Sequence, residues 1–289
     1  MPSTRTLSLT GLAMIAFAGN SILCRLALKA TSIDAVSFTG IRIFSGALML
    51  ALLLRLRRRA AREGGNWRAA AALFVYAAAF SYAYVQLDAG TGALLLFGAV
   101  QVTMIVVGLL RGERLRGQAL LGFLLALGGL LVQLLPSASA PPLAGALLML
   151  LSGVAWGLYS LLGRTGSDPL AISTGNFVRA IAFAALLAAF FHSDLRVDSI
   201  GAVYAVLSGA VASGIGYAIW YSALPGLSAI QGASVQLSVP ILAALSGAVL
   251  LGEAISLRLA LVSLAVLGGI ALILLAKVRA PTPLTPTKA

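Results

Sequence analysis

Long apolar runs, separated by short interruptions, constrain this chain of 289 residues more than any other feature. A helix needs about 20 mostly apolar residues to cross a bilayer, and most of these runs are that long. A membrane β-barrel would instead show segments of about ten residues with alternating polarity, which these runs lack. We expect ten membrane-spanning helices, at residues 7–28, 35–55, 67–87, 91–111, 117–135, 141–162, 169–191, 199–223, 229–252 and 257–276.

Composition agrees with an all-α membrane protein. Hydrophobic residues make up 60% of the chain and charged residues 10%, whereas soluble domains average about 25% charged residues. Disordered proteins and soluble enzymes are therefore excluded, and the single Cys24 excludes an internal disulfide. The ten runs occupy nearly the whole chain, which leaves no room for a soluble catalytic or nucleotide-binding domain.

The positive charges are distributed unevenly between alternate loops. With the N-terminus in the cytoplasm, the inside loops hold the arginine-rich segments 55–68 and 111–116, while few Lys and Arg fall outside. This bias predicts that both termini are cytoplasmic. The net charge of +12 then reflects topology and contact with anionic membrane lipid, and nucleic acid is not an expected partner.

An internal repeat divides the chain. A shift of 140 residues pairs Gly112-Glu113 with Gly252-Glu253, and Gly128-Gly129 with Gly268-Gly269. The expected units are a first repeat at 1–140, a second at 141–280 and a cytoplasmic tail at 281–289. Each repeat holds five helices, and because five is odd the second repeat must enter the membrane inverted. Transporters built from inverted repeats carry their substrate site near the membrane midplane, between the halves.

These motifs resemble the drug/metabolite transporter superfamily, in particular its EamA-type members. The resemblance rests on the stretches that begin at Gly112-Glu113 and Gly252-Glu253, on Pro240 and on Trp156-Gly157. The first repeat departs from the Trp-Gly pattern, because it has Asn20-Ser21 at the corresponding position. It implies a secondary transporter of small metabolites, and the bacterial aromatic amino acid exporters are the nearest in function. Such a protein would lie in the bacterial inner membrane.

Polar and aromatic side chains inside the expected helices are the candidates for substrate binding, because such residues usually face the interior of a helix bundle. Helix packing and helix–helix hydrogen bonds are the alternative roles for them. Pro240 is a candidate hinge, since it would leave the carbonyl of Gln236 without a donor. The candidate binding residues are Asn20, Cys24, Tyr76, Tyr82, Gln101, Trp156, Tyr159, Tyr217, Trp220 and Gln236.

Charge inside the membrane is scarce. All eight acidic residues fall in loops or at the ends of the expected helices, so no carboxylate is placed to carry a proton, and we expect facilitated movement. Arg42 and Arg179, which the repeat pairs, are the only charges that we expect inside the membrane, away from the helix ends. We favour a structural role for both, by snorkelling or by bonding loop carbonyls, over contact with a substrate carboxylate.

The sequence offers few residues that could support enzyme chemistry. The single His192 lies in a loop beside Asp194, so we expect no enzyme activity, no metal and no cofactor. The sequence therefore predicts an exporter of neutral and aromatic amino acids with a cavity between the two halves. A drug or nucleoside-type metabolite exporter and, from a different class, a gated pore are the alternatives. The oligomeric state stays open.

Overall fold

The computed structural model describes residues 3–57, 64–110, 112, 114–115, 117–136, 140–162, 168–227 and 235–275. These residues form helices and no strands. The tail at 281–289, Glu113 and several loop arginines used for the predicted topology lie outside the described residues. The α-helices are α1 (Thr4–Ala30), α2 (Ala35–Leu56), α3 (Trp67–Tyr84), α4 (Ala89–Leu110), α5 (Gln118–Leu134), α6 (Leu143–Leu162), α7 (Pro169–Phe190), α8 (Ser199–Val206), α9 (Gly216–Ala223), α11 (Ser238–Leu251) and α12 (Leu257–Leu275). A π-helix, η3 (Leu207–Ile215), joins α8 to α9, and short 3-10 turns lie at His192–Asp194 and Leu224–Gly226.

Each of the ten expected runs overlaps helix in the described part of the chain. Seven of the described helical segments are long and apolar enough to cross a membrane, counting α8, η3 and α9 as one. The helices α5 and α11 are apolar but shorter, and much of the expected span before α11 lies outside the described residues. The 18 residues of α3 are less apolar because they include Arg68 and three tyrosines.

The run at 199–223 does not form the uninterrupted α-helix that its apolar pattern predicts. Its middle is the π-helix η3, which packs against α2. The two backbones approach so closely that a Cβ on Gly209 would lie 2.1 Å from the carbonyl oxygen of Arg42. Only glycine fits this contact, which hydropathy alone could not reveal. Long π-helical stretches are rare and often lie at functional sites.

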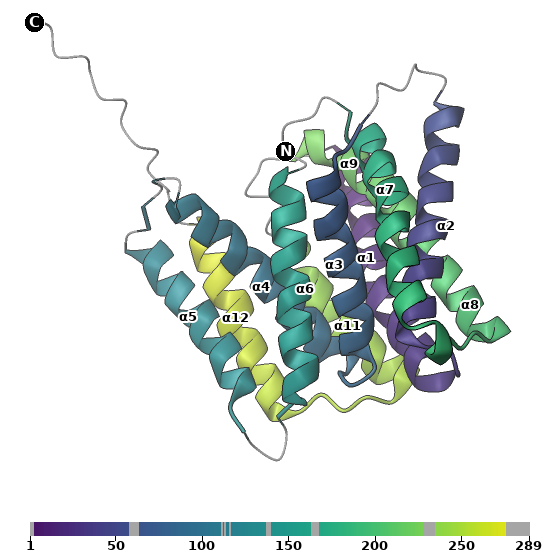
Figure 1. Cartoon of the computed structure of the whole chain (residues 1–289). Coiled ribbons are helices and arrows are strands. Elements are labelled where there is room, and N and C mark those ends of the chain that lie inside the picture. Colours follow the sequence, from purple (N-terminus) through teal and green to yellow (C-terminus); the bar gives the residue numbers. More distant parts are fainter. Residues whose placement is uncertain are drawn as a thin grey trace, which may run out of the picture.

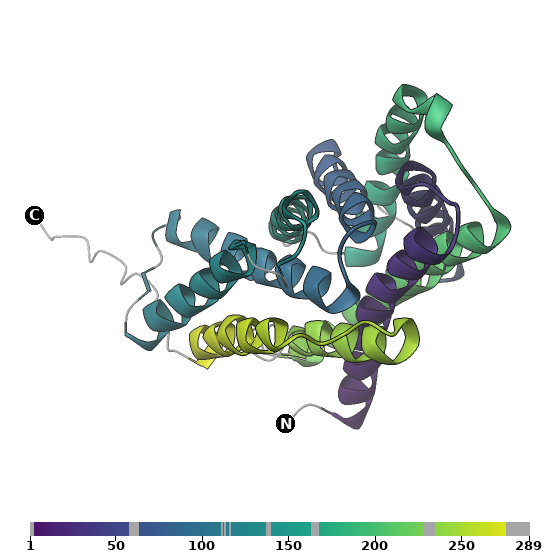
Figure 2. The same cartoon turned by 90° about the horizontal axis from the view of Figure 1, so that it is seen from below.

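Most of the helices pack around a common centre, and α5 and α12 lie together at one side (Figures 1 and 2). The helix α3 packs against α6, and α1 packs against η3 and α9. The helix α2 packs against α7, while α4 contacts both α6 and α11. The first and second parts of the chain are thus interleaved.

Acidic residues cap several helices at their N-termini. The carboxylate of Asp34 accepts hydrogen bonds from the first turn of α2, and Asp168 and Asp198 do the same for α7 and α8. Each satisfies amides that have no partner within the helix. Burial opposes ionisation of Asp34, but hydrogen bonds from Arg196 and from α2 outweigh it and hold the pKa of this carboxyl below its ordinary value.

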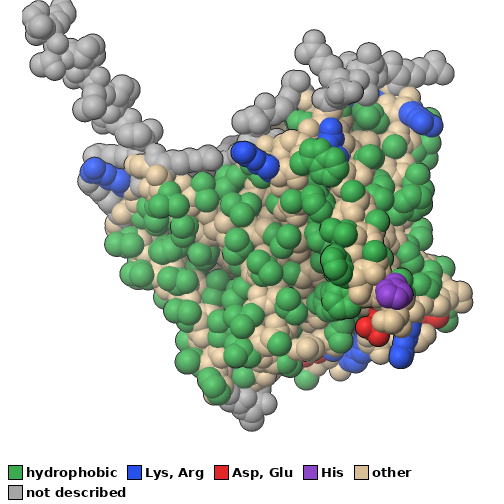
Figure 3. Space-filling view, viewed as in Figure 1, with side chains coloured by type: hydrophobic (Ala, Val, Ile, Leu, Met, Phe, Trp, Pro, Cys, Tyr) green, Lys and Arg blue, Asp and Glu red, His purple; other side chains and the backbone are tan. Residues whose placement is uncertain are grey.

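The flanks of the molecule are covered with apolar side chains, and the charged ones gather towards the two ends of the helices (Figure 3). Leu48, Leu124, Leu147 and Leu264 are all more than half exposed. An apolar surface of this extent is unfavourable in water and stable against lipid chains. The structure is therefore that of a multi-pass membrane protein.

Candidate substrate site

A cavity lies among the helices at the centre of the bundle. The space free of atoms at this site, including the part that is open to the outside, is about 420 Å³. Its described lining carries no Lys, Arg, Asp or Glu. The lining residues are Phe17, Asn20, Ser21, Tyr76, Phe80, Leu96, Phe97, Trp156, Ala212, Ser213, Tyr217 and Gln236.

Aromatic rings form much of the wall, with Trp156 of α6 at their centre. Its ring centroid lies 4.7 Å from that of Tyr76 and 5.3 Å from that of Tyr217. Behind it, Tyr159 stacks on Trp156 at 5.3 Å. Phe17 meets Tyr217 edge to face at 6.0 Å. Such a wall suits an aromatic or branched apolar group, because aromatic pairs favour these offset and edge-on geometries.

A polar network occupies another part of the wall. The Asn20 Oδ1 atom accepts a hydrogen bond of 2.6 Å from Ser208 of η3, and its Nδ2 atom lies 3.5 Å from the Tyr76 hydroxyl. Arg42 Nη2 donates to the same hydroxyl at 2.8 Å. The network joins α1, α2, α3 and η3, so the π-helix places Ser208 where it fixes the orientation of the Asn20 amide.

Arg42 does not snorkel, so one of the two structural roles expected of it is wrong. Its side chain lies inside the bundle, and the residue is 2% exposed. The guanidinium carbon lies 5.1 Å from the ring centroid of Tyr76 and 4.8 Å from that of Phe80, both of which line the cavity. Its Nη1 atom has no hydrogen-bond partner among the described residues.

For Arg179 the expected bond to a loop carbonyl is confirmed. Its Nη1 atom donates to the carbonyl oxygens of Gly64 and Gly175, both at 3.0 Å. The first of these carbonyls belongs to the loop before α3 and the second to α7 itself. The two arginines that the repeat pairs therefore have different surroundings.

The structure brings five of the ten candidate binding residues to the cavity: Asn20, Tyr76, Trp156, Tyr217 and Gln236. The other five candidates do not line it. Cys24 is fully buried and Gln101 nearly so, Tyr82 is partly exposed, Tyr159 lies behind Trp156, and Trp220 packs on Phe17 at 6.1 Å.

Some lining residues are apolar, and they are not among the candidates expected from the sequence. Phe17 lies three residues before Asn20 on α1, and Phe97 and Ala212 are small or apolar residues on α4 and η3. Helical spacing from a polar candidate was the signal that could have found Phe17, because residues three apart share a face.

Pro240 is the third residue of α11 and follows a helix break at Leu237. A proline in the first turn of a helix removes an amide that would have no partner anyway. The break directly follows Gln236, which lines the cavity. Pro240 as a hinge remains a prediction.

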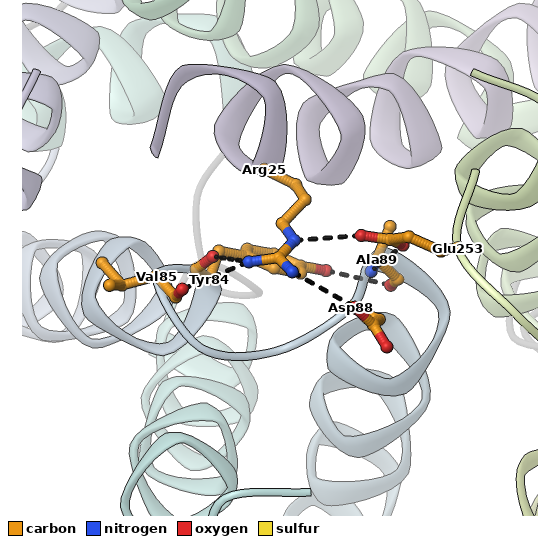
Figure 4. Close-up of polar contacts among 6 residues, drawn as sticks. All are labelled: Arg25, Tyr84, Val85, Asp88, Ala89 and Glu253. Carbon is orange, nitrogen blue, oxygen red and sulfur yellow. Dashed lines mark hydrogen bonds and ion pairs between the residues drawn. The ribbon is translucent and has the colours of Figure 1, made fainter. Parts of the chain in front are cut away.

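An ion-pair cluster links α1 to the end of α3, the start of α4 and the turn after α11 (Figure 4). We call it the Arg25 cluster; it comprises Arg25, Asp88 and Glu253 with the backbone at 84, 85 and 89. Arg25 Nε lies 2.9 Å from Glu253 Oε1, and its Nη2 atom lies 3.2 Å from Asp88 Oδ1. Its Nη1 atom donates to two carbonyls at the end of α3. Arg25 comes four residues after the cavity residue Ser21, so the cluster lies about one helical turn along α1 from the cavity.

The Gly-Glu motif explains part of this cluster. Gly252 ends α11 in the left-handed conformation, with φ of +66°, which glycine adopts without strain. Glu253 then turns back, and its Oε2 atom accepts a hydrogen bond of 2.7 Å from the amide of Ala89 at the start of α4. In the first repeat, Gly112 also has a positive φ, of +92°.

Comparison with known proteins finds one family twice in the chain. Residues 5–135 and residues 143–275 each match the EamA-like transporter family, within the drug/metabolite transporter superfamily. An uncharacterized protein of Pseudomonas aeruginosa, PA1977, is 77% identical over 275 residues, which cover 95% of this chain and 96% of that protein. The fold is similar to that of a protein solved by crystallography, with a TM-score of 0.66 and 21% sequence identity. The match covers 95% of this chain and 99% of that chain, and it concerns the fold alone.

Proposed function

Because the chain belongs to the EamA-like transporter family, we propose that it exports neutral and aromatic amino acids through the central cavity. Membership of the family implies a membrane transporter of small metabolites. The observation that supports the finer proposal is the lining of the cavity, where the rings around Trp156 adjoin the network of Asn20 and Tyr76. The rings would hold an apolar side chain, and the network would hold the polar end of the substrate.

We further propose that the halves, 1–140 and 141–280, are inverted repeats. The helix contacts support this proposal, because exchanging the halves converts the contact of α3 with α6 into that of the α8–η3–α9 segment with α1. It leaves three other contacts unchanged: α2 with α7, α4 with α11, and α5 with α12. The positive φ angles of Gly112 and Gly252, 140 residues apart, agree with it. Rocking of one half against the other would expose the cavity to each side in turn.

Facilitated movement is the mechanism we propose. The described lining holds no carboxylate that would bind and release a proton during transport. We also propose, from the excess of Lys and Arg in alternate loops, that both termini face the cytoplasm of a bacterial inner membrane.

Uptake of radiolabelled phenylalanine and leucine into liposomes that contain the purified full chain tests the function. We expect saturable uptake and counterflow, with little response to an imposed pH gradient. A matched panel of nucleosides and hydrophobic drugs tests the alternative cargo. If no neutral amino acid shows saturable uptake, the amino acid proposal is wrong, and a steep dependence on the pH gradient would contradict facilitated movement.

A further inference from the structure

Arg42 is a permanent positive charge inside the bundle without an acidic partner among the described residues. The ion pairs of the described residues join Arg25 to Asp88 and Glu253, and Arg57 to Asp168. A guanidinium does not lose its proton in proteins, and an unpaired charge away from water is costly. The rings of Tyr76 and Phe80 compensate for part of this cost by cation–π contact. An anion bound nearby would compensate for more.

The charge is connected to the cavity through Tyr76. The Tyr76 hydroxyl accepts hydrogen bonds from Arg42 and Asn20, and it donates none to the described residues. Its own proton is therefore available to a ligand, and the guanidinium at 2.8 Å strengthens it as a donor.

Both lone pairs of the Tyr76 oxygen and one of the two on Asn20 Oδ1 are used within this network. Asn20 Oδ1 accepts from Ser208, and the Tyr76 oxygen accepts from Arg42 and Asn20. What the network offers is donors: the Tyr76 hydroxyl, the Asn20 amide nitrogen and, behind them, the positive charge of Arg42. Donors backed by a positive charge suit a carboxylate and disfavour an ammonium group, which carries the same charge as Arg42.

We propose that Tyr76 and Asn20 form a carboxylate subsite of the cavity, with Arg42 as the positioning residue that supplies the counter-charge. The ligands are small monocarboxylates with an aromatic or branched apolar body, and an amino group is not required. This inference rests on the proposed function of the cavity as a substrate site, and it extends the cargo from amino acids to their analogues that lack the amine.

Three ligands that share a phenylethyl body test the proposal: phenylalanine, 3-phenylpropionate, which lacks the amine, and 2-phenylethylamine, which lacks the carboxylate. Binding to the purified full chain is followed by tryptophan fluorescence, and transport is measured in liposomes. We expect both carboxylates to bind, and the amine to bind at least tenfold more weakly.

Substitutions then locate the subsite. Arg42→Gln and Tyr76→Phe should weaken both carboxylates at least tenfold and leave the amine unchanged, and Arg42→Lys should restore part of the affinity because it restores the charge. Arg179→Gln is the matched control, since the bonds of Arg179 to the described residues are all to backbone carbonyls. It should leave the order of the three ligands unchanged. A merely structural Arg42 would not alter selectivity between ligands of different charge.

The proposal is overturned if the amine binds as tightly as 3-phenylpropionate, or if Arg42→Gln weakens all three ligands equally. If Arg42→Gln does not fold, the order of ligands on the unchanged protein and the effect of Tyr76→Phe decide. Saturable transport of an uncharged nucleoside with both carboxylates inert would refute the subsite and leave a transport function intact. If nothing in the wider panel binds or is transported, the proposed function fails as well.

Discussion

We expect the Arg25 cluster to hold the bundle closed at its end of the cavity, and Glu253→Gln is the change that tests this expectation. The side chains of Arg25 and Glu253 are 8% and 5% exposed, so their ion pair at 2.9 Å is buried. Removing one partner of a buried pair costs about 3–5 kcal/mol. Asp88, whose side chain is 52% exposed, remains beside Arg25 and offsets at most about 1 kcal/mol. The closed arrangement should therefore lose about 2–4 kcal/mol, a factor of about 30 to 700 in the population open at this end, at 1.4 kcal/mol per factor of ten.

Cys24 provides the assay, because it is the only cysteine of the chain, precedes Arg25 on α1 and is 0% exposed. A hydrophilic, membrane-impermeant thiol reagent reaches it only when this end opens, so the labelling rate reports the open population. We expect Glu253→Gln to raise that rate about 30- to 700-fold, in proportion to the opening calculated above. Asp88→Asn removes the exposed partner and should raise it no more than about fivefold. Cys24→Ser supplies the blank.

Two results would refute this reasoning. One is a labelling rate in Glu253→Gln within threefold of that in the unchanged protein, which would mean that the pair does not hold the end closed. The other is a larger effect from Asp88→Asn than from Glu253→Gln, which would reverse the order set by burial. Circular dichroism of each variant checks that helix content is unchanged, so that labelling reports opening and not unfolding.

Three further predictions concern other parts of the chain. Gly209→Ala should lower the thermal unfolding midpoint sharply, since the new Cβ would lie 2.1 Å from the α2 backbone. Gly128→Ala is the control and should not lower the midpoint, because a Cβ there would meet nothing within 4 Å. Equal effects of the two substitutions would contradict the close approach of η3 to α2. Trp156→Ala should raise the KM for phenylalanine at least tenfold, because it removes the centre of the aromatic wall. Trp67→Ala is the control, since Trp67 is 58% exposed, and it should leave the KM unaltered. The pKa of Asp34 is lowered in the folded chain, so its contribution to stability is present above about pH 4 and is lost as the pH falls through the lowered folded value. The unfolding midpoints of Asp34→Asn and the unchanged protein should therefore differ at pH 7, and the difference should shrink as the pH falls below about 4. A difference that stays constant with pH would show that the carboxylate is not responsible.

The sequence alone determined the solvent of this protein and the positions of its helices. Apolar runs of bilayer length can only be helices in lipid, where no water satisfies the backbone. The sequence also placed the acidic residues in loops or at the ends of these runs, and the structure shows that Asp34, Asp168 and Asp198 cap helices there. The Gly-Glu motif also predicted correctly that the chain contains one domain twice, as the two family matches confirm.

Only the tertiary structure decided which polar residues meet at the cavity. Asn20 and Cys24 lie one turn apart on α1, yet Asn20 lines the cavity and Cys24 is buried elsewhere. Arg42 and Arg179 are paired by the repeat, but one lies among aromatic rings and the other bonds backbone carbonyls. The physical reason is that a helix in lipid is apolar on its outer face as well as on its buried face. Hydropathy therefore places a helix in the membrane without orienting it, and the contacts with neighbouring helices set its rotation.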